Sequence, residues 1–143
     1  MALFTESELR YLTSERRLAR LATVGANGTP HVVPVGMWSY NESLGTIDVA
    51  GRDLVQSKKF RDVARSGRAA LVVDDLARTD PWRPRAVEVR GRAEAIEEPQ
   101  TLVRIHPERV ELGTRKRPQR AKRQLRLSAR RTAAPSPSLK IRW

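Results

Sequence analysis

The stretch SKKFRDVARSGRAALVVDD, residues 57–75, changes its hydrophobic period part of the way along. Apolar residues in its first half recur at three- and four-residue spacing, which predicts a short amphipathic helix over residues 57–66. Ser57 suits the N-cap of this helix, and Gly67 suits the position just after its last turn. The run AALVV at 69–73, followed by two aspartates, is typical of a buried central strand. A short helix placed directly before a core strand is therefore the pattern from which the fold is predicted.

Strand-like segments lie on both sides of this stretch. An N-terminal helix is predicted to begin at a capping box of Thr5 and Glu8 and to end near Thr13. Because the two helices are inserted among the strands and do not alternate with them, the pattern favours a small antiparallel barrel over a doubly wound sheet. Pro34 lacks an N–H, so its strand should lie at an edge or contain a bulge. Six strands are predicted, at residues 18–24, 31–38, 46–51, 69–73, 86–95 and 102–112.

Charge divides the 143-residue chain into two parts. Residues 1–113 carry 17 Lys and Arg against 16 Asp and Glu, whereas residues 114–143 carry eleven Lys and Arg and no acidic residue. We therefore predict a folded domain over 1–113 and a basic tail over 114–143 whose composition is typical of disorder. The tail is either a true arm that binds nucleic acid nonspecifically or the product of an altered reading frame.

Several classes of function are disfavoured by what the sequence lacks. It has no cysteine, no phosphate-binding glycine loop, no nucleophile elbow and only two histidines, so we expect no metal site. Its first residues do not resemble a signal peptide, and no apolar run is long enough to span a bilayer, so we expect a cytoplasmic protein without a membrane partner. An enzyme of this composition would take its difficult chemistry from an imported cofactor.

Two lysines follow Ser57 in the first turn of the predicted helix. Lys58 and Lys59 oppose the helix dipole, which favours anions at an N-terminus. A bound phosphate would reverse this unfavourable placement, because free N–H groups, the Ser57 hydroxyl and both ammonium groups could contact it. The alternative is a solvated helix with two exposed lysines.

A second candidate segment is RTDPWRPR, residues 78–85, which is predicted to be a proline-rich loop. Trp82 lies between two prolines that hold the backbone extended. Its ring could cover a planar ligand, pack in a subunit interface or close one end of the barrel.

Four segments together resemble a known family. They are RLATVGANGTPHVVPVGMW, IDVAGRDLVQSKKFRDVARSGRAALVVDD, DPWRPRAVEVRGRAEAI and RIHPERV, which follow one another in the order seen in pyridoxamine-phosphate-oxidase-like split-barrel proteins. The resemblance covers about residues 5–112. The resemblance is greatest to the actinobacterial branch that uses the deazaflavin coenzyme F420. It implies a mainly β fold, a six-stranded antiparallel split β-barrel of the FMN-binding type, which forms a homodimer with two cofactor sites across the interface.

The resemblance also implies which residues bind the cofactor. The strand at 31–35 would lie along its ring, the backbone of 50–51 would approach it, and 57–59 would hold its phosphate. Trp82 and Arg83 would line the cofactor or substrate wall and could reach the partner's site. The implied cofactor-binding residues are His31, Val33, Pro34, Val35, Ala50, Gly51, Ser57, Lys58, Lys59, Trp82 and Arg83.

The activity implied is hydride transfer from reduced coenzyme F420 to a small electron-poor organic substrate. The cofactor carries the hydride, so no side chain is expected to be catalytic. FMN is the alternative cofactor, in an oxidase, a reductase or a carrier without turnover. Vitamin B6 oxidation is disfavoured, because HVVPVGM is apolar where true pyridoxamine-phosphate oxidases have an Arg and a Lys that hold FMN phosphate.

Overall fold

The computed structural model describes residues 3–113, so the basic tail predicted at 114–143 and its proposed contact with nucleic acid lie outside the described residues. The described chain forms a curled antiparallel sheet with short helices. In chain order its elements are α1 (Glu6–Ser14), β1 (Ala19–Val24), β2 (Pro30–Val35), β3 (Trp38–Asn41), β4 (Thr46–Val49), the 3-10 helix η1 (Leu54–Gln56), α2 (Lys58–Ser66), β5 (Arg68–Thr79), β6 (Trp82–Ile96) and β7 (Leu102–Leu112).

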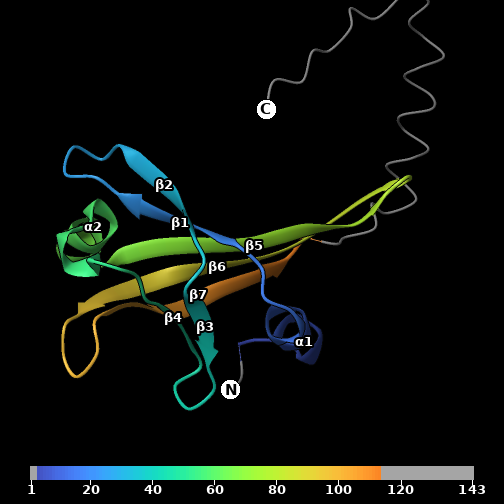
Figure 1. The fold of residues 1–143 in the computed structure, drawn as a ribbon, viewed down its shortest axis with the longest axis horizontal. Helices are drawn as coiled ribbons and strands as arrows, with labels where there is room; N and C mark the ends of the chain where they lie inside the picture. The colour runs from blue at the N-terminus through green and yellow to red at the C-terminus, as the bar shows by residue number, and fades with distance from the viewer. Residues whose placement is uncertain (1–2, 114–143) are drawn as a thin grey trace, which may run out of the picture.

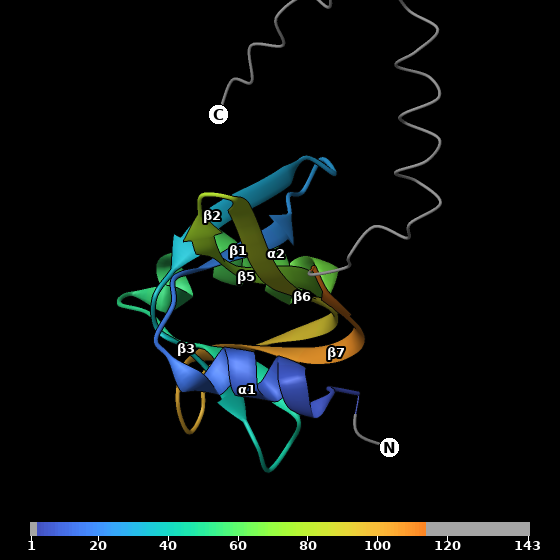
Figure 2. The same cartoon turned by 90° about the vertical axis from the view of Figure 1, so that its right-hand side faces the viewer.

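The strands form one sheet in the order β2-β1-β5-β6-β7-β4-β3, and every pair of neighbours is antiparallel. Figure 2 shows the sheet curling, with β1 and β5 in its upper part and β3 and β7 in its lower part. In Figure 1, α2 and the turn between β5 and β6 lie at opposite ends of the molecule. The mainly β split-barrel class predicted from the sequence is confirmed.

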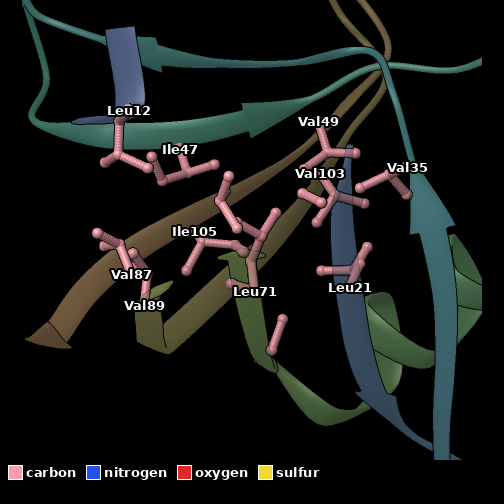
Figure 3. Packing of buried hydrophobic residues seen from close by; sticks show 14 of the residues in the cluster. Leu12, Leu21, Val35, Ile47, Val49, Leu71, Val87, Val89, Val103 and Ile105 are labelled. Atoms are coloured by element: carbon pink, nitrogen blue, oxygen red, sulfur yellow. The ribbon is translucent and has the colours of Figure 1, made fainter. Parts of the chain in front are cut away.

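The core fills the inside of this curl. Leu21, Leu71, Val89 and Ile105 come from four different strands, are at most 1% exposed, and belong to one hydrophobic cluster, part of which Figure 3 shows. On β1 the inward face is made by Ala19, Leu21 and Thr23, whereas Val24 of the opposite face and Leu18, just before the strand, are exposed. This explains the imperfect alternation of residues 18–24, because the outward face carries apolar residues beside Arg20.

The predicted helix ends are confirmed. Thr5 Oγ1 accepts from the Glu8 N–H at 3.2 Å, and Glu8 Oε2 accepts from the Thr5 N–H at 2.8 Å, which is a complete capping box. Ser57 caps α2 by accepting from the Phe60 N–H at 3.3 Å. Gly67 ends α2 with a φ of 65°, a conformation that favours glycine.

The strand predicted at 31–38 is two strands, so the sheet has seven strands where six were expected. The break falls at residues 36–37, between β2 and β3. β2 then lies at one edge of the sheet, where Pro34 is opposite Arg20 of β1. Its place at the edge agrees with the expectation for a strand that contains proline.

The prediction of a loop at 78–85 was wrong. β5 continues to Thr79 and β6 begins at Trp82, so only Asp80 and Pro81 form the turn. β7 pairs with β6 only from Val87 onward, so within the described chain the end of the β5–β6 hairpin is a two-stranded ribbon that projects from the sheet (Figure 1). Pro84 is accommodated because the ribbon has an open strand edge, which needs no N–H from it.

Candidate functional site

The Ser57 hydroxyl at the N-terminus of α2 already makes hydrogen bonds within the chain. Ser57 Oγ donates to the Leu54 carbonyl at 2.6 Å and accepts from the Phe60 N–H. The hydroxyl therefore holds the 3-10 helix η1 against the start of α2. It could donate to a phosphate only if the bond to Leu54 were broken.

Lys58 has an internal partner that the sequence analysis did not consider. Its ammonium donates to both carboxylate oxygens of Asp62, at 3.1 and 3.0 Å, across one turn of α2. Half of the Lys58 side chain is exposed, whereas only 3% of the Asp62 side chain is. Asp62 therefore supplies the negative charge that offsets the unfavourable position of Lys58 at the helix start.

Two further groups complete what we call the Asp62 cluster, formed by Thr23, Lys58, Asp62 and Arg65. The Thr23 hydroxyl donates to Asp62 at 2.9 Å, and Arg65 donates to it at 3.2 Å and to the Val24 carbonyl at 2.7 Å. Burial would raise the pKa of Asp62, but the hydrogen bonds from Lys58, Thr23 and Arg65 outweigh it and lower the pKa to about 2. With one anion and two cations, the cluster keeps a net positive charge.

A hollow of about 480 Å³ lies beside this cluster at the turn between β1 and β2. It is lined by Ala26, Asn27, Thr29, Pro30, His31 and Lys58. His31 Nε2 is buried and has no hydrogen-bond partner within the described residues. A Cβ atom at Gly25 would lie 3.4 Å from Lys58 Nζ and 3.0 Å from the Thr29 carbonyl, so a side chain there would crowd the ammonium. An unpaired imidazole nitrogen beside a half-exposed ammonium fits an anionic group such as a phosphate.

The remaining residues predicted near this end are distributed as follows. His31, Val33 and Val35 share one face of β2, and Pro34 lies on the other. The N–H of Ala50 donates to the Met37 carbonyl at 2.7 Å, and Gly51 packs near Leu54. The ammonium of Lys59 makes no hydrogen bond or ion pair with residues 3–113. The structure thus brings His31 and Lys58 to one hollow, whereas Lys59, the next residue of the helix, does not line it.

Trp82 and Arg83 are not brought to this site within one chain. They lie at the end of the β5–β6 ribbon, and α2 lies at the opposite end of the molecule (Figure 1). Trp82 is 56% exposed, so it does not close an end of the barrel, which was one of the three interpretations of this residue.

Sequence reasoning missed a second charged group, which we call the Asp75 cluster: Tyr11, Arg17, Asp75 and Arg85. Arg85 donates to Asp75 at 2.8 and 2.6 Å, Arg17 donates to it at 2.9 Å, and the Tyr11 hydroxyl donates to it at 3.2 Å. Hydrogen bonds from Arg85, opposed by burial, lower the pKa of Asp75 to about 2. Burial and the Asp75 charge raise the pKa of Tyr11 to about 12. The three partners of Asp75 are one hydroxyl and two guanidinium groups. Because they come from separate parts of the chain, no local sequence pattern could have revealed the group.

A larger hollow does not compete for a phosphate. It has a volume of about 730 Å³ and lies against β6, β7 and Glu8. Its charged lining residues are Glu8, Glu88, Glu111 and Arg109, which give a net negative charge. None of the predicted site residues lines it, and an anion would be repelled there.

Over residues 3–113 the structure has no group of three or more His, Asp or Glu side chains that could hold a metal ion. In the same part of the chain, neither α-helix has the length and apolar composition needed to cross a membrane.

Comparisons with known proteins agree with this fold. The model of the family described as pyridoxamine 5'-phosphate oxidase matches residues 5–133. A 5a,11a-dehydrotetracycline/5a,11a-dehydrooxytetracycline reductase of Streptomyces rimosus is 43% identical over 116 residues, which cover 75% of this chain and 80% of the relative.

Two solved structures show the same fold at low identity. A conserved hypothetical protein of Mycobacterium tuberculosis is 21% identical with a TM-score of 0.62, covering 78% of this chain and 85% of its own. A protein named F420 reductase is 18% identical with a TM-score of 0.55, covering 71% of this chain and 94% of its own. The family match and the reductase relative together show that this chain belongs to the pyridoxamine 5'-phosphate oxidase family.

Proposed function

We propose that the protein is an oxidoreductase that uses reduced coenzyme F420 to transfer hydride to a small electron-poor organic substrate. The observation that carries the proposal is the hollow at the β1–β2 turn, which Lys58 and His31 both line: the Lys58 side chain is half exposed, and His31 Nε2 is buried and unpaired within the described residues. Both groups suit the phosphate of a flavin or deazaflavin. The family match and the relative named as a reductase support the class of reaction.

The side chains of this chain would bind and orient, while the cofactor would supply the hydride. Lys58 and His31 would hold the phosphate. Val33, on the same face of β2 as His31, would give the ring an apolar surface that excludes water, whereas Val35 is 6% exposed and packs in the core. Correct placement of the two reactants is then the main contribution of the protein to the rate.

The separation of the two predicted groups favours a homodimer. Trp82 and Arg83 lie far from Lys58 within one chain (Figure 1), so a second subunit would have to bring its ribbon to this site. Trp82 is 56% exposed and therefore accessible to a partner. Chemical crosslinking or light scattering of the full chain tests this directly, and a monomer at all concentrations would remove Trp82 and Arg83 from the site.

The central test is a titration of the purified full chain with coenzyme F420 and with FMN, followed by fluorescence. We expect saturable binding of coenzyme F420 with a Kd well below about 1 mM. Reduction assays with a dehydrotetracycline, a quinone, a nitro compound and an enone then test turnover. If neither cofactor binds below about 1 mM, the proposal fails.

FMN remains the second candidate cofactor, because a lysine at this position can hold either phosphate. The same titration separates the two cofactors by affinity. Tight FMN binding without F420 binding would change the cofactor but keep the site. Cofactor binding without reduction of any tested substrate would favour a carrier.

A further inference from the structure

The Asp62 carboxylate is bound by side chains from its own helix and also from a strand of the sheet. It accepts from Lys58, Thr23 and Arg65, which lie on β1 and α2, and its side chain is 3% exposed. We propose that Asp62 is a positioning residue, which holds the Lys58 ammonium at the hollow so that it is already placed for the cofactor phosphate. The proposal rests on the function proposed above, because it assigns a role to a residue behind the same site.

Fixing a lysine in advance favours binding, because a long flexible side chain otherwise loses its rotamer freedom when the ligand arrives. Both oxygens of Asp62 lie 3.0–3.1 Å from Lys58 Nζ, so the ammonium is held from one side. An ammonium has three N–H donors, and contact with two oxygens leaves at least one for the hollow. The position of the Lys58 ammonium, and with it the point at which the anionic group of a ligand would contact it, is therefore fixed before binding.

Asp62 is itself fixed by groups that do not face the hollow. The Thr23 side chain is on the core face of β1 and is 2% exposed as a residue. Arg65 also donates to the Val24 carbonyl, which connects α2 to the end of the same strand. The lysine is thus positioned relative to β1 and the turn that follows it, and this turn provides the other residues of the hollow.

A carboxylate near a phosphate would normally weaken binding by repulsion. Here Arg65 and Lys58 together outnumber the single negative charge of Asp62, and Asp62 lies behind the ammonium, in the interior. The placement of Lys58 should therefore outweigh the repulsion. The opposite possibility, in which Asp62 competes with the phosphate for Lys58, predicts an effect of opposite sign.

The test measures the contribution of the phosphate end of the cofactor, with Asp62→Asn in the full chain. Each protein is titrated with a phosphorylated cofactor and its phosphate-free counterpart: FMN and riboflavin, or coenzyme F420 and the deazaflavin without its phosphate. The readout is the Kd of the phosphate-free compound divided by the Kd of the phosphorylated one. We expect Asp62→Asn to reduce this ratio about tenfold, which is ~1.4 kcal/mol, with little change for the phosphate-free compound.

Asp75→Asn is the matched control, because Asp75 also accepts from two cations and a hydroxyl but lies away from the hollow. It should lower thermal stability and leave the ratio unchanged. An unchanged ratio in Asp62→Asn, which includes an equal loss of affinity for both compounds, would overturn the positioning role. An increased ratio would overturn it as well. If the wild-type protein binds neither phosphorylated cofactor, the proposed function fails first, and this role fails with it.

Discussion

The Asp62 cluster and the Asp75 cluster are built from the same chemical parts. Each has an aspartate that accepts from two cationic side chains and one hydroxyl, and in each the aspartate pKa is lowered to about 2. The Asp75 cluster connects α1 and the segment after it to β5 and β6. The Asp62 cluster connects α2 to β1. Similar electrostatics therefore hold the two helices to the sheet.

The clusters differ in whether their cations remain available to bind a ligand. The Arg17 side chain is 7% exposed, its guanidinium lies 4.1 Å from the centre of the Tyr11 ring, and it also donates to the Tyr11 carbonyl. Lys58 is half exposed and lines a hollow with an unpaired histidine nitrogen. Burial and the number of remaining donors, and not the presence of an ion pair, therefore separate a structural charge from one that can bind a ligand.

The largest effect expected from this comparison is on stability. Arg17→Ala should lower the free energy of unfolding by about 3 kcal/mol, because it removes a nearly buried guanidinium with its hydrogen bonds to Asp75 and to the Tyr11 carbonyl, although Asp75 keeps Arg85. Urea denaturation monitored by circular dichroism measures this change. Cofactor affinity should stay at the wild-type value at temperatures where the variant is folded. A loss of affinity without a loss of stability would contradict the structural assignment of the Asp75 cluster.

Lys58→Ala should have the opposite profile. Cofactor binding should weaken by roughly 1–3 kcal/mol, as expected for a lost charge-assisted contact. The free energy of unfolding should fall by less than about 1 kcal/mol, because the lysine is half exposed and the buried Asp62 carboxylate keeps its hydrogen bonds from Thr23 and Arg65. Fluorescence titration and urea denaturation of the same preparation measure both quantities. Lys59→Ala is the neighbouring control, and a larger loss of affinity in that variant would move the phosphate from Lys58 to Lys59.

Acid should remove the stabilising effect of both clusters over the same range. The folded-state pKa of each aspartate is about 2, below the ordinary aspartate value of 3.8, so each contributes stability above about pH 4 that is lost as pH falls toward 2. Asp62→Asn and Asp75→Asn should each flatten the dependence of unfolding free energy on pH between those values. A dependence identical to wild type in either variant would show that the aspartate is not ionised against its partners.

The smallest effect is expected where both side chains of an ion pair are more than half exposed. Arg68 and Glu108 are joined at 3.2 Å, with side chains 66% and 55% exposed. Glu108→Gln should change the free energy of unfolding by less than about 0.5 kcal/mol. Urea denaturation gives the value, which is the baseline for the other variants. A cost equal to that of Arg17→Ala would remove burial as the explanation of the difference between the clusters.

Much of the fold could be predicted because its signals are local. The capping box at Thr5 and the N-cap and final glycine of α2 lie within one or two turns of chain, and each is confirmed. The loop predicted at 78–85 was wrong because two prolines normally argue against a strand, and only the pairing of β6 shows that this edge is open.

The site could be predicted less well because its arrangement is set by distant parts of the chain. The pairing of Lys58 with Asp62 had a sequence signal, since the two residues are four apart on a helix. The contact of Asp62 with Thr23 joins residues 39 apart, and no periodicity indicates it. The hydrogen bond from the Ser57 hydroxyl to the Leu54 carbonyl likewise depends on the geometry of η1.

The most direct test of the account is a crystal structure of the full chain with its phosphorylated cofactor bound. We predict that the phosphate lies at the α2 end of the molecule, with its oxygens within hydrogen-bonding reach of the Lys58 ammonium and with Lys58 still paired to Asp62. A phosphate bound instead at the Asp75 cluster, or a Lys58 ammonium turned away from it, would contradict the account.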